Sequence, residues 1–271
     1  MATERLQKIL AASGRCSRRA AEALITAGRV RVNGQVTATL GSRADAQRDR
    51  IEVDGQRIVL ARPVHYLYFK PRAVVSTLHD PEGRRTVQHD LRALRQRVFP
   101  VGRLDYHTSG ALLLTNDGGL SDALLRPEAR VPKVYVAKVQ GHVETEALAQ
   151  LRQGVRLEDG VRTRPAEVIV LREDTRHSWL QITLHEGKNR QIHRMGEAVG
   201  HRVMRLARLS FAGLTTEGMR PGQLRPVSEK ELRTLKRQYL RSGPRRRGRK
   251  PGEKNAPGSR NAPTAIDSDG E

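Results

Sequence analysis

The pattern of apolar and polar positions divides the chain into a short N-terminal region and a longer second region. In the first, "TERLQKILAASG" and "SRRAAEALITAG" carry apolar residues at helical spacing, and each ends at a glycine. The alternating runs "RVRVNGQV" and "DRIEVDGQRI" follow, with Asn-Gly and Asp-Gly dipeptides that suit tight hairpin turns. Residues 1–61 are therefore predicted to form a small domain of two helices followed by hairpins.

The second region, residues 62–240, alternates strand-like and helical segments in an irregular order. Its strand-like runs include "VHYLYFK", "VYVAKVQG", "SWLQITL" and "VMRLARLSF", and its helical runs include "GLSDALL" and "RQIHRMGEAVG". This order favours an α+β domain, with a largely antiparallel mixed sheet and flanking helices, over a regular βαβ repeat. Ser228 and Glu231 form a capping-box pattern, which predicts a last helix from about 229 to 240.

Residues 241–271 differ in composition from the rest of the chain. They contain many Gly, Pro and Arg residues and almost no large apolar residue. Such a segment cannot bury enough surface to offset its ordering entropy, so we expect a disordered basic tail. Its "RRRGRK" run either adds phosphate contacts or only increases solubility.

The net charge identifies the kind of partner. The chain contains 50 Lys and Arg residues and 29 Asp and Glu residues, which gives a formal net charge of +21. Arginine binds phosphate in a bidentate manner and stacks on bases, so a nucleic acid is expected rather than a membrane. We expect a cytoplasmic protein, because no long apolar run or signal peptide is present. The single cysteine, Cys16, excludes a disulfide within one chain.

The stretch "VGRLDYHTSGALLLTNDG" places one carboxylate, Asp105, among basic and aromatic residues. In an extended segment Arg103 and Asp105 share one face, while Leu104 points into the core. A cation at such close range favours the ionised form of the carboxylate. The spacing alone allows two interpretations, a structural ion pair with Arg103 or a reactive group at the start of a loop.

Several other chemistries are excluded by their missing residues. "HEGKN" lacks the second histidine of a zinc protease helix, and "EGKNRQ" lacks the glycine spacing of a phosphate-binding loop. No G-x-S-x-G elbow, dinucleotide fingerprint or convincing metal-ligand spacing is present, so we expect neither a metal nor a cofactor. One carboxylate with arginines and aromatics suits chemistry at the anomeric carbon of a sugar.

These motifs carry a resemblance to a known family. Residues 1–61 resemble the small S-four-like RNA-binding domain. "GRLDYHTSGALLLTNDG", "PKVYVAKVQG" and "EGKNRQIHRMGEAVGHRVMRLARL", in that order, resemble the RsuA/RluB family of ribosomal RNA pseudouridine synthases. The similarity spans about residues 1–240 and implies a pseudouridine-synthase catalytic domain at 62–240. It also implies ribosomal RNA or pre-ribosomal particles as the partner, no cofactor, and a monomer.

The resemblance also implies roles for individual residues. Asp105 falls on the catalytic aspartate, and Tyr135 on the tyrosine that stacks on the target base. Arg103 falls on the arginine that helps to hold the target nucleotide out of its helix. The substrate site also includes residues of the "EGKNRQIHR" segment, and in the N-terminal domain a phosphate face is expected. These residues are Arg190, His193 and Arg194 in the segment, and Arg15, Arg18, Arg19, Arg29 and Arg31 in the face.

Three alternatives remain open from the sequence. The family usually has Arg or Lys where this chain has His193, so either His193 or the following Arg194 is the partner of Asp105. Large-subunit ribosomal RNA is the favoured substrate, with small-subunit RNA as the alternative. A non-catalytic RNA-binding ribosome-assembly protein, in which Asp105 only pairs with Arg103, fits the composition equally well.

Overall fold

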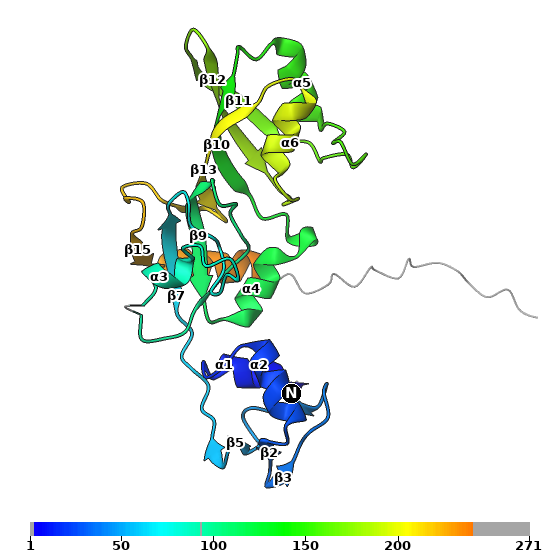
Figure 1. Ribbon diagram of the computed structural model, residues 1–271, viewed down its shortest axis with the longest axis vertical. Helices are drawn as coiled ribbons and strands as arrows, with labels where there is room; N and C mark the ends of the chain where they lie inside the picture. Colours follow the sequence, from blue (N-terminus) through cyan, green and yellow to red (C-terminus); the bar gives the residue numbers. More distant parts are fainter. Residues whose placement is uncertain (1–2, 93, 241–271) are drawn as a thin grey trace, which may run out of the picture. The chain divides into compact units, whose positions relative to one another are not determined.

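The computed structural model describes residues 3–92 and 94–240. The predicted tail at 241–271 lies outside the described residues. No helix in the described ranges is long and apolar enough to cross a membrane. The predicted α+β class is confirmed, with an N-terminal domain of helices and short strands and a second domain built on one large sheet (Figure 1).

The N-terminal domain contains the two predicted helices, α1 (Leu6–Ala12) and α2 (Arg18–Thr26). Ser17 caps α2, because its side chain accepts a hydrogen bond from Ala20 N at 3.1 Å. The helices pack on a core that includes Ile9 and Ile25, which are buried. The strands follow in the sheet order β3-β2-β5-β6, with a separate pair β1-β4. Their bounds are Glu4–Arg5 (β1), Val30–Val32 (β2), Gln35–Val36 (β3), Arg43–Ala44 (β4), Ile51–Val53 (β5) and Gln56–Arg57 (β6).

Both predicted hairpin turns are confirmed. Asn33 and Gly34 join β2 to β3 with φ angles of 52° and 84°, and Asp54 and Gly55 join β5 to β6 with φ angles of 51° and 75°. Two successive residues with positive φ are the pattern of a type I′ turn, which matches the twist of the paired strands. Asparagine, aspartate and glycine tolerate this backbone region best, so the dipeptides fix the turn positions.

The second domain is built on a nine-stranded sheet within the described ranges. Seven strands run in the order β11-β12-β10-β13-β9-β7-β15, while β14 pairs with β13 and β8 pairs with β9. Their bounds are His65–Lys70 (β7), Phe99–Pro100 (β8), Ser109–Thr115 (β9), Lys133–Gln140 (β10), Glu167–Glu173 (β11), His177–Leu184 (β12), Val203–Phe211 (β13), Leu214–Thr215 (β14) and Leu224–Pro226 (β15).

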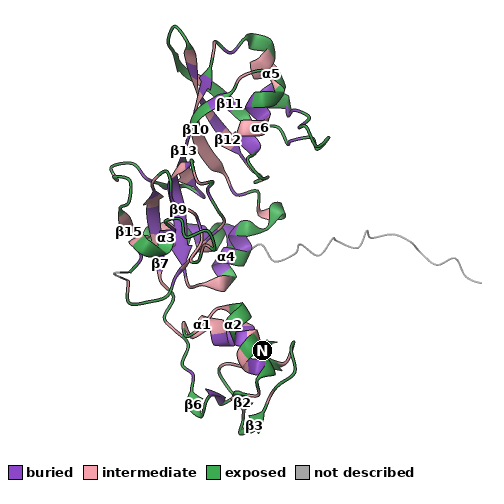
Figure 2. Cartoon of the chain, in the orientation of Figure 1, coloured by how far each residue is buried: buried purple, intermediate pink, exposed green. Residues whose placement is uncertain are grey.

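The helices of this domain cover the two ends of the sheet differently (Figure 2). Around β7 and β9, apolar cores form on both faces, one with α4 and α7 and the other with α3. Around β10 to β13, a single core forms against α5 and α6. The helices are α3 (Val87–Asp90), α4 (Gly118–Leu125), α5 (Thr145–Gln153), α6 (Gln191–Ala198) and α7 (Glu229–Leu235), with a 3-10 turn at Pro127–Ala129 and a π-helix at Lys236–Leu240.

The predicted last helix is confirmed, with a change in its final turn. The Ser228 side chain accepts from Glu231 N, and the Glu231 side chain accepts from Ser228 N, so the capping box is complete. The α-helix ends at Leu235 and continues as a π-helix to Leu240.

The two ends of the sheet meet where β13 pairs in parallel with β9; the other strand pairs of this sheet are antiparallel. At this junction Gly110 faces Arg208, with φ of +113°. A Cβ atom on Gly110 would lie 2.0 Å from the carbonyl oxygen of Arg208. Only glycine therefore allows the strands to approach this closely, and the predicted site lies beside this junction.

Candidate active site

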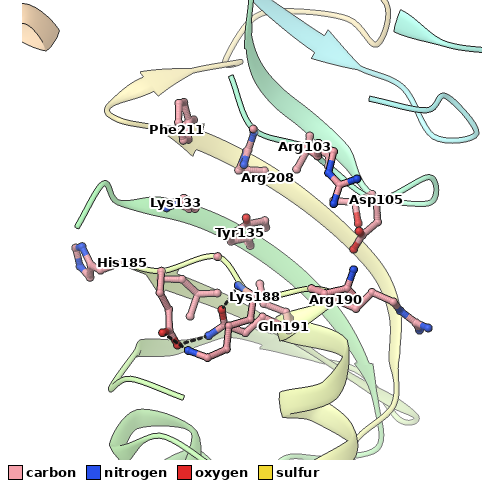
Figure 3. A pocket seen from close by; sticks show the side chains of 18 of the residues that line it. Arg103, Asp105, Lys133, Tyr135, His185, Lys188, Arg190, Gln191, Arg208 and Phe211 are labelled. Atoms are coloured by element: carbon pink, nitrogen blue, oxygen red, sulfur yellow. Dashed lines mark hydrogen bonds and ion pairs between the residues drawn. The ribbon is translucent and has the colours of Figure 1, made fainter. Parts of the chain in front are cut away.

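A pocket of about 680 Å³ opens beside the β13-β9 junction (Figure 3). Its volume lies within the range of about 300–1,000 Å³ that is usual for ligand sites. Its walls come from the loop 101–108, from strands β10 and β13, and from the turn 185–190. We call the loop 101–108 the Asp105 loop and the turn 185–190 the Glu186 turn. Asp105 and Glu186 are the carboxylates among the described lining residues.

The Asp105 loop is held in place by hydrogen bonds to the segment that follows β7. The buried Ser76 hydroxyl donates to Leu104 O at 2.7 Å and accepts from Leu104 N at 3.0 Å. Ala73 N donates to Tyr106 O at 2.8 Å. Leu104 is buried, as predicted, and its backbone is fixed on both sides. Asp105 itself is exposed, and these hydrogen bonds fix the backbone of the residues before and after it.

Of the two interpretations of Arg103 and Asp105, the structural ion pair is not found in the described part of the chain. Both side chains are exposed, and in the described part of the chain no ion pair within 4.0 Å joins them. The alternation of exposed and buried residues around Leu104 is as expected, but two exposed side chains gain little from pairing in water. Asp105 also has no side-chain hydrogen bond in this part of the chain, so its oxygen atoms are available to a ligand.

A buried lysine lies behind the Asp105 loop. Lys70, at the end of β7, is fully buried, and its Nζ donates to Val74 O at 2.7 Å and to Pro71 O at 2.9 Å. Burial lowers the pKa of Lys70 to about 8, against the opposite effect of the Asp105 charge. This lysine therefore fixes the turn after β7 and also lies within electrostatic range of the Asp105 carboxylate.

Tyr135 lies on β10 in the centre of the pocket wall, and it is half-buried. Its partner across the sheet is Arg208 on β13, because the pairing shifts register between Val134 and Tyr135. Without that shift the partner would be Leu209, which lies one residue further along β13. Bulges of this kind re-aim side chains, and here the bulge places an arginine beside the tyrosine ring.

The Glu186 turn is fixed by its own side chains. The Glu186 carboxylate accepts from Gln191 Nε2 at 2.7 Å and from Arg164 N at 2.9 Å, and it also pairs with Lys188. Burial acts to raise the pKa of Glu186, but the bonds from Lys188 and Arg164 outweigh it and hold this pKa below its ordinary value. This acid is engaged by the protein itself and serves to shape the turn.

The Glu186 turn leads into α6 through Arg190, which has a left-handed φ of 45°. Arg190 is exposed and lines the pocket at the end where Asp105 lies (Figure 3). Such a backbone conformation is costly for a residue with a side chain and is often found at functional sites. Arg190, which the sequence predicted for the substrate site, therefore lies at the pocket.

His193 and Arg194 occupy different surroundings. His193 lines the pocket, and its Nδ1 atom is buried without a hydrogen-bond partner among the described residues. Burial and the charge of Arg190 lower the pKa of His193, whereas the Asp105 charge acts in the opposite direction. Arg194 is outside the pocket lining, and its guanidinium binds Asp159 at 2.6 Å and Glu158 at 3.2 Å. Of the two alternatives, the structure brings His193 to the pocket and engages Arg194 elsewhere.

The arginines predicted for the phosphate face of the N-terminal domain are all exposed: Arg15, Arg18, Arg19, Arg29 and Arg31. Arg29 is also engaged, because its guanidinium donates two hydrogen bonds to Asp54 at 2.8 and 2.6 Å. A guanidinium held in this way offers fewer donors to a phosphate than an unpaired one.

The chain matches two family models over most of its described length. The RNA pseudouridylate synthase model matches residues 64–198, and the S4 domain model matches residues 4–46. The "Ribosomal large subunit pseudouridine synthase B" of Bacillus subtilis (strain 168) is 44% identical over 86% of this chain and 96% of its own length. The chain belongs to the RsuA/RluB family of RNA pseudouridine synthases. It is an isomerase with an RNA-binding domain.

Two further comparisons agree with this assignment of the synthase. An "Uncharacterized RNA pseudouridine synthase" of Aquifex aeolicus (strain VF5) is 39% identical over 90% of the chain and 98% of its own length. A solved structure described as "Crystal structure of pseudouridylate synthase" superposes with a TM-score of 0.63 and 25% identity, covering 85% of this chain and 99% of that one. The alternative of a non-catalytic RNA-binding protein is therefore not supported.

Sequence reasoning missed several residues that the structure places in or behind the pocket of this synthase. Lys70 lies in the largely apolar run "YLYFKPR" and Arg208 in the strand-like run "VMRLARLSF", and neither run marks its cation as a site residue. Lys133 stands two residues before Tyr135, on the same face of β10, and this spacing could have identified it. For Arg208 no such signal exists, because the bulge that aligns it with Tyr135 forms only in the sheet.

Proposed function

We propose that this synthase converts uridine of ribosomal RNA to pseudouridine, with Asp105 as the catalytic carboxylate and large-subunit RNA as the substrate. The observation that carries the catalytic assignment is the contrast between the two carboxylates of the pocket. Glu186 is engaged by Lys188, Gln191 and the Arg164 amide, whereas Asp105 is exposed on an anchored loop without a side-chain partner. The substrate assignment is supported by the name of the Bacillus subtilis relative, a ribosomal large subunit pseudouridine synthase.

The reaction exchanges one bond between the uracil ring and the ribose for another. The bond from N1 to the anomeric carbon breaks, the base turns while it stays bound, and ring carbon C5 joins the anomeric carbon. C5 loses a proton and N1 gains one, so the product has the same atoms as the substrate. Asp105 either attacks the anomeric carbon or removes a sugar proton in an elimination, and both routes require an ionised carboxylate with free oxygen atoms.

The target uridine must leave its stack before Asp105 can reach the ribose. This step costs a few kcal/mol, and stacking of the base on Tyr135 returns about 1–3 kcal/mol. Arg103 and Arg190 lie at the Asp105 end of the pocket, where they can neutralise the RNA backbone beside the flipped nucleotide. His193, with its lowered pKa, would face the sugar as a neutral imidazole.

We further propose that residues 1–61 anchor the RNA through Arg15, Arg18, Arg19, Arg29 and Arg31. Each phosphate contact releases counterions, so the affinity for RNA falls steeply with salt. Deletion of residues 1–61 is expected to weaken RNA binding and to flatten the plot of log K against log salt. A filter-binding titration at several salt concentrations measures both quantities. An unchanged binding curve would show that the N-terminal domain is not the anchor.

The central test is to map pseudouridines in ribosomal RNA from cells with and without this protein. The cells that lack it are then complemented with the wild-type chain or with Asp105→Asn. We expect at least one large-subunit pseudouridine that requires the protein and is restored by wild type alone. Sites confined to small-subunit RNA would contradict the substrate assignment and leave the activity intact. Restoration by Asp105→Asn would contradict the catalytic role of Asp105.

A further inference from the structure

The far end of the pocket contains a buried positive charge that the proposed mechanism does not use. Arg208 is only 3% exposed, yet it lines the pocket and lies between Phe211 and Arg103 (Figure 3). Its Nε donates to Ala111 O at 2.8 Å, and its Nη2 is buried without a hydrogen-bond partner. In the described part of the chain, no carboxylate forms an ion pair with Arg208. Buried guanidinium groups normally have an anionic partner, because the desolvation of an unpaired charge is costly.

A second cation lies close to this arginine. Lys133 lines the same part of the pocket, and its Nζ donates to Val131 O at 2.9 Å and lies 6.0 Å from the centre of the Phe211 ring. Burial and the charge of Arg208 lower the pKa of Lys133 to about 8, with Glu186 acting in the opposite direction. The two cations thus lie near enough to repel each other.

A polar group of the Asp105 loop also lacks a partner. Thr108 is buried, lines the pocket, and has an Oγ1 atom without a hydrogen bond in the described ranges. It stands two residues before Gly110, which is the parallel partner of Arg208. The neighbourhood therefore offers a guanidinium, an ammonium and a hydroxyl, and these groups together suit an oxyanion.

We propose that Arg208 and Lys133 form an inner phosphate subsite, which receives a phosphodiester next to the flipped target uridine. This inference rests on the proposed function. Uracil and ribose are neutral and cannot compensate two cations, whereas each nucleotide of the substrate carries one phosphate charge. Arg208 and Tyr135 are cross-strand neighbours, so a base stacked on Tyr135 brings its own phosphates within reach of Arg208. The subsite fixes the register of the RNA strand.

The test uses a synthetic ribosomal RNA hairpin that the wild-type chain modifies. One phosphodiester on the 5′ or 3′ side of the target uridine is replaced by a neutral methylphosphonate, and a matched hairpin keeps the same sugar with an ordinary phosphate. We expect one of the two replacements to raise the KM of wild type about 10-fold, since a charged hydrogen bond is lost. In Arg208→Gln the ordinary hairpin shows the same rise, and the methylphosphonate adds less than about 2-fold.

Two further variants keep this test interpretable if Arg208→Gln folds poorly. Arg208→Lys retains the charge without the bidentate fork, and Lys133→Gln leaves Arg208 in place; both should show a smaller KM rise and reduced sensitivity to the methylphosphonate. Arg205→Gln is the matched control, because Arg205 lies on the same strand but is exposed and outside the pocket lining. It should respond to the methylphosphonate as wild type does.

A measurement without RNA separates this inference from the proposed function. Inorganic phosphate should raise the pKa of Lys133 in wild type but not in Arg208→Gln. An NMR titration of the Lys133 side-chain carbon atoms measures this pKa. If phosphate has this effect and no RNA is converted, the subsite stands and the proposed function fails. If RNA is converted, the pKa of Lys133 ignores phosphate and the two KM penalties multiply, the subsite is overturned.

Discussion

The Asp105 loop and the Glu186 turn form opposite walls of one pocket, and each contributes one carboxylate. In the loop, hydrogen bonds hold the backbone on either side of Asp105 and leave its side chain without a partner. In the turn, the carboxylate itself is the centre of the network and accepts from Lys188, Gln191 and Arg164 N. The oxygen atoms of a structural carboxylate accept hydrogen bonds from the protein, whereas those of a catalytic carboxylate must stay free for the substrate.

The largest expected effect separates the two carboxylates directly. Asp105→Asn should lower kcat at least about 10³-fold, because the amide can neither attack carbon nor remove a proton, while the free energy of unfolding changes by less than about 0.5 kcal/mol. Glu186→Gln should keep at least about a tenth of kcat but lose about 1–3 kcal/mol of stability, since it breaks a partly buried charged network. Single-turnover kinetics and urea unfolding measure the two quantities. The comparison fails if Glu186→Gln has the larger effect on kcat.

A smaller effect tests whether backbone anchoring positions Asp105. Ser76→Ala leaves the amide and carbonyl groups of Leu104 unpaired in a buried site, and it should cost about 1–3 kcal/mol of stability. A loop released in this way should also lower kcat about 10-fold, with the Kd for RNA unchanged.

Ser178→Ala is the matched control for this loop variant. Ser178 is fully buried, and its hydroxyl lies 2.9 Å from both Gly141 O and Glu173 Oε1, away from the pocket lining. It should lose similar stability with kcat preserved. An equal fall of kcat in both variants would show that general destabilisation, and not the position of the loop, limits the reaction.

The smallest effect concerns the lysine behind the loop. The pKa of Lys70 is about 8 in the folded chain and has an ordinary value of 10.5 when exposed. Between these values the unfolded chain binds more protons than the folded one, so Lys70 makes stability rise with pH from about 8 to 10.5, by at most about 1.4 kcal/mol per pH unit.

Urea unfolding at a series of pH values measures this contribution of Lys70. Lys70→Met should make the rise shallower, leaving the share that Lys133 contributes. The exposed Lys230→Met serves as a control and should retain the wild-type slope. A slope in Lys70→Met equal to that of wild type would contradict the lowered pKa.

Local signals in the sequence predicted those parts of the fold that depend on neighbouring residues. The Ser17 cap, the Asn33-Gly34 turn and the Ser228 capping box were all found as predicted. Each depends on contacts within a few residues of the chain, which spacing and propensity describe well. The spacing of Arg103 and Asp105 allowed two interpretations, and the structural ion pair is not formed within the described residues, where the loop exposes both side chains to water.

The sequence by itself determined the α+β class, the positions of most helices and strands, the basic character and, through its motifs, the family. Only the tertiary structure decided which polar groups meet in the pocket. The parallel junction at Gly110, the bulge opposite Tyr135 and the burial of Lys70 and Arg208 each depend on segments that are far apart along the chain. The physical reason is that hydrogen-bond register and desolvation are properties of packed strands, and no local pattern in one strand encodes its partner's alignment.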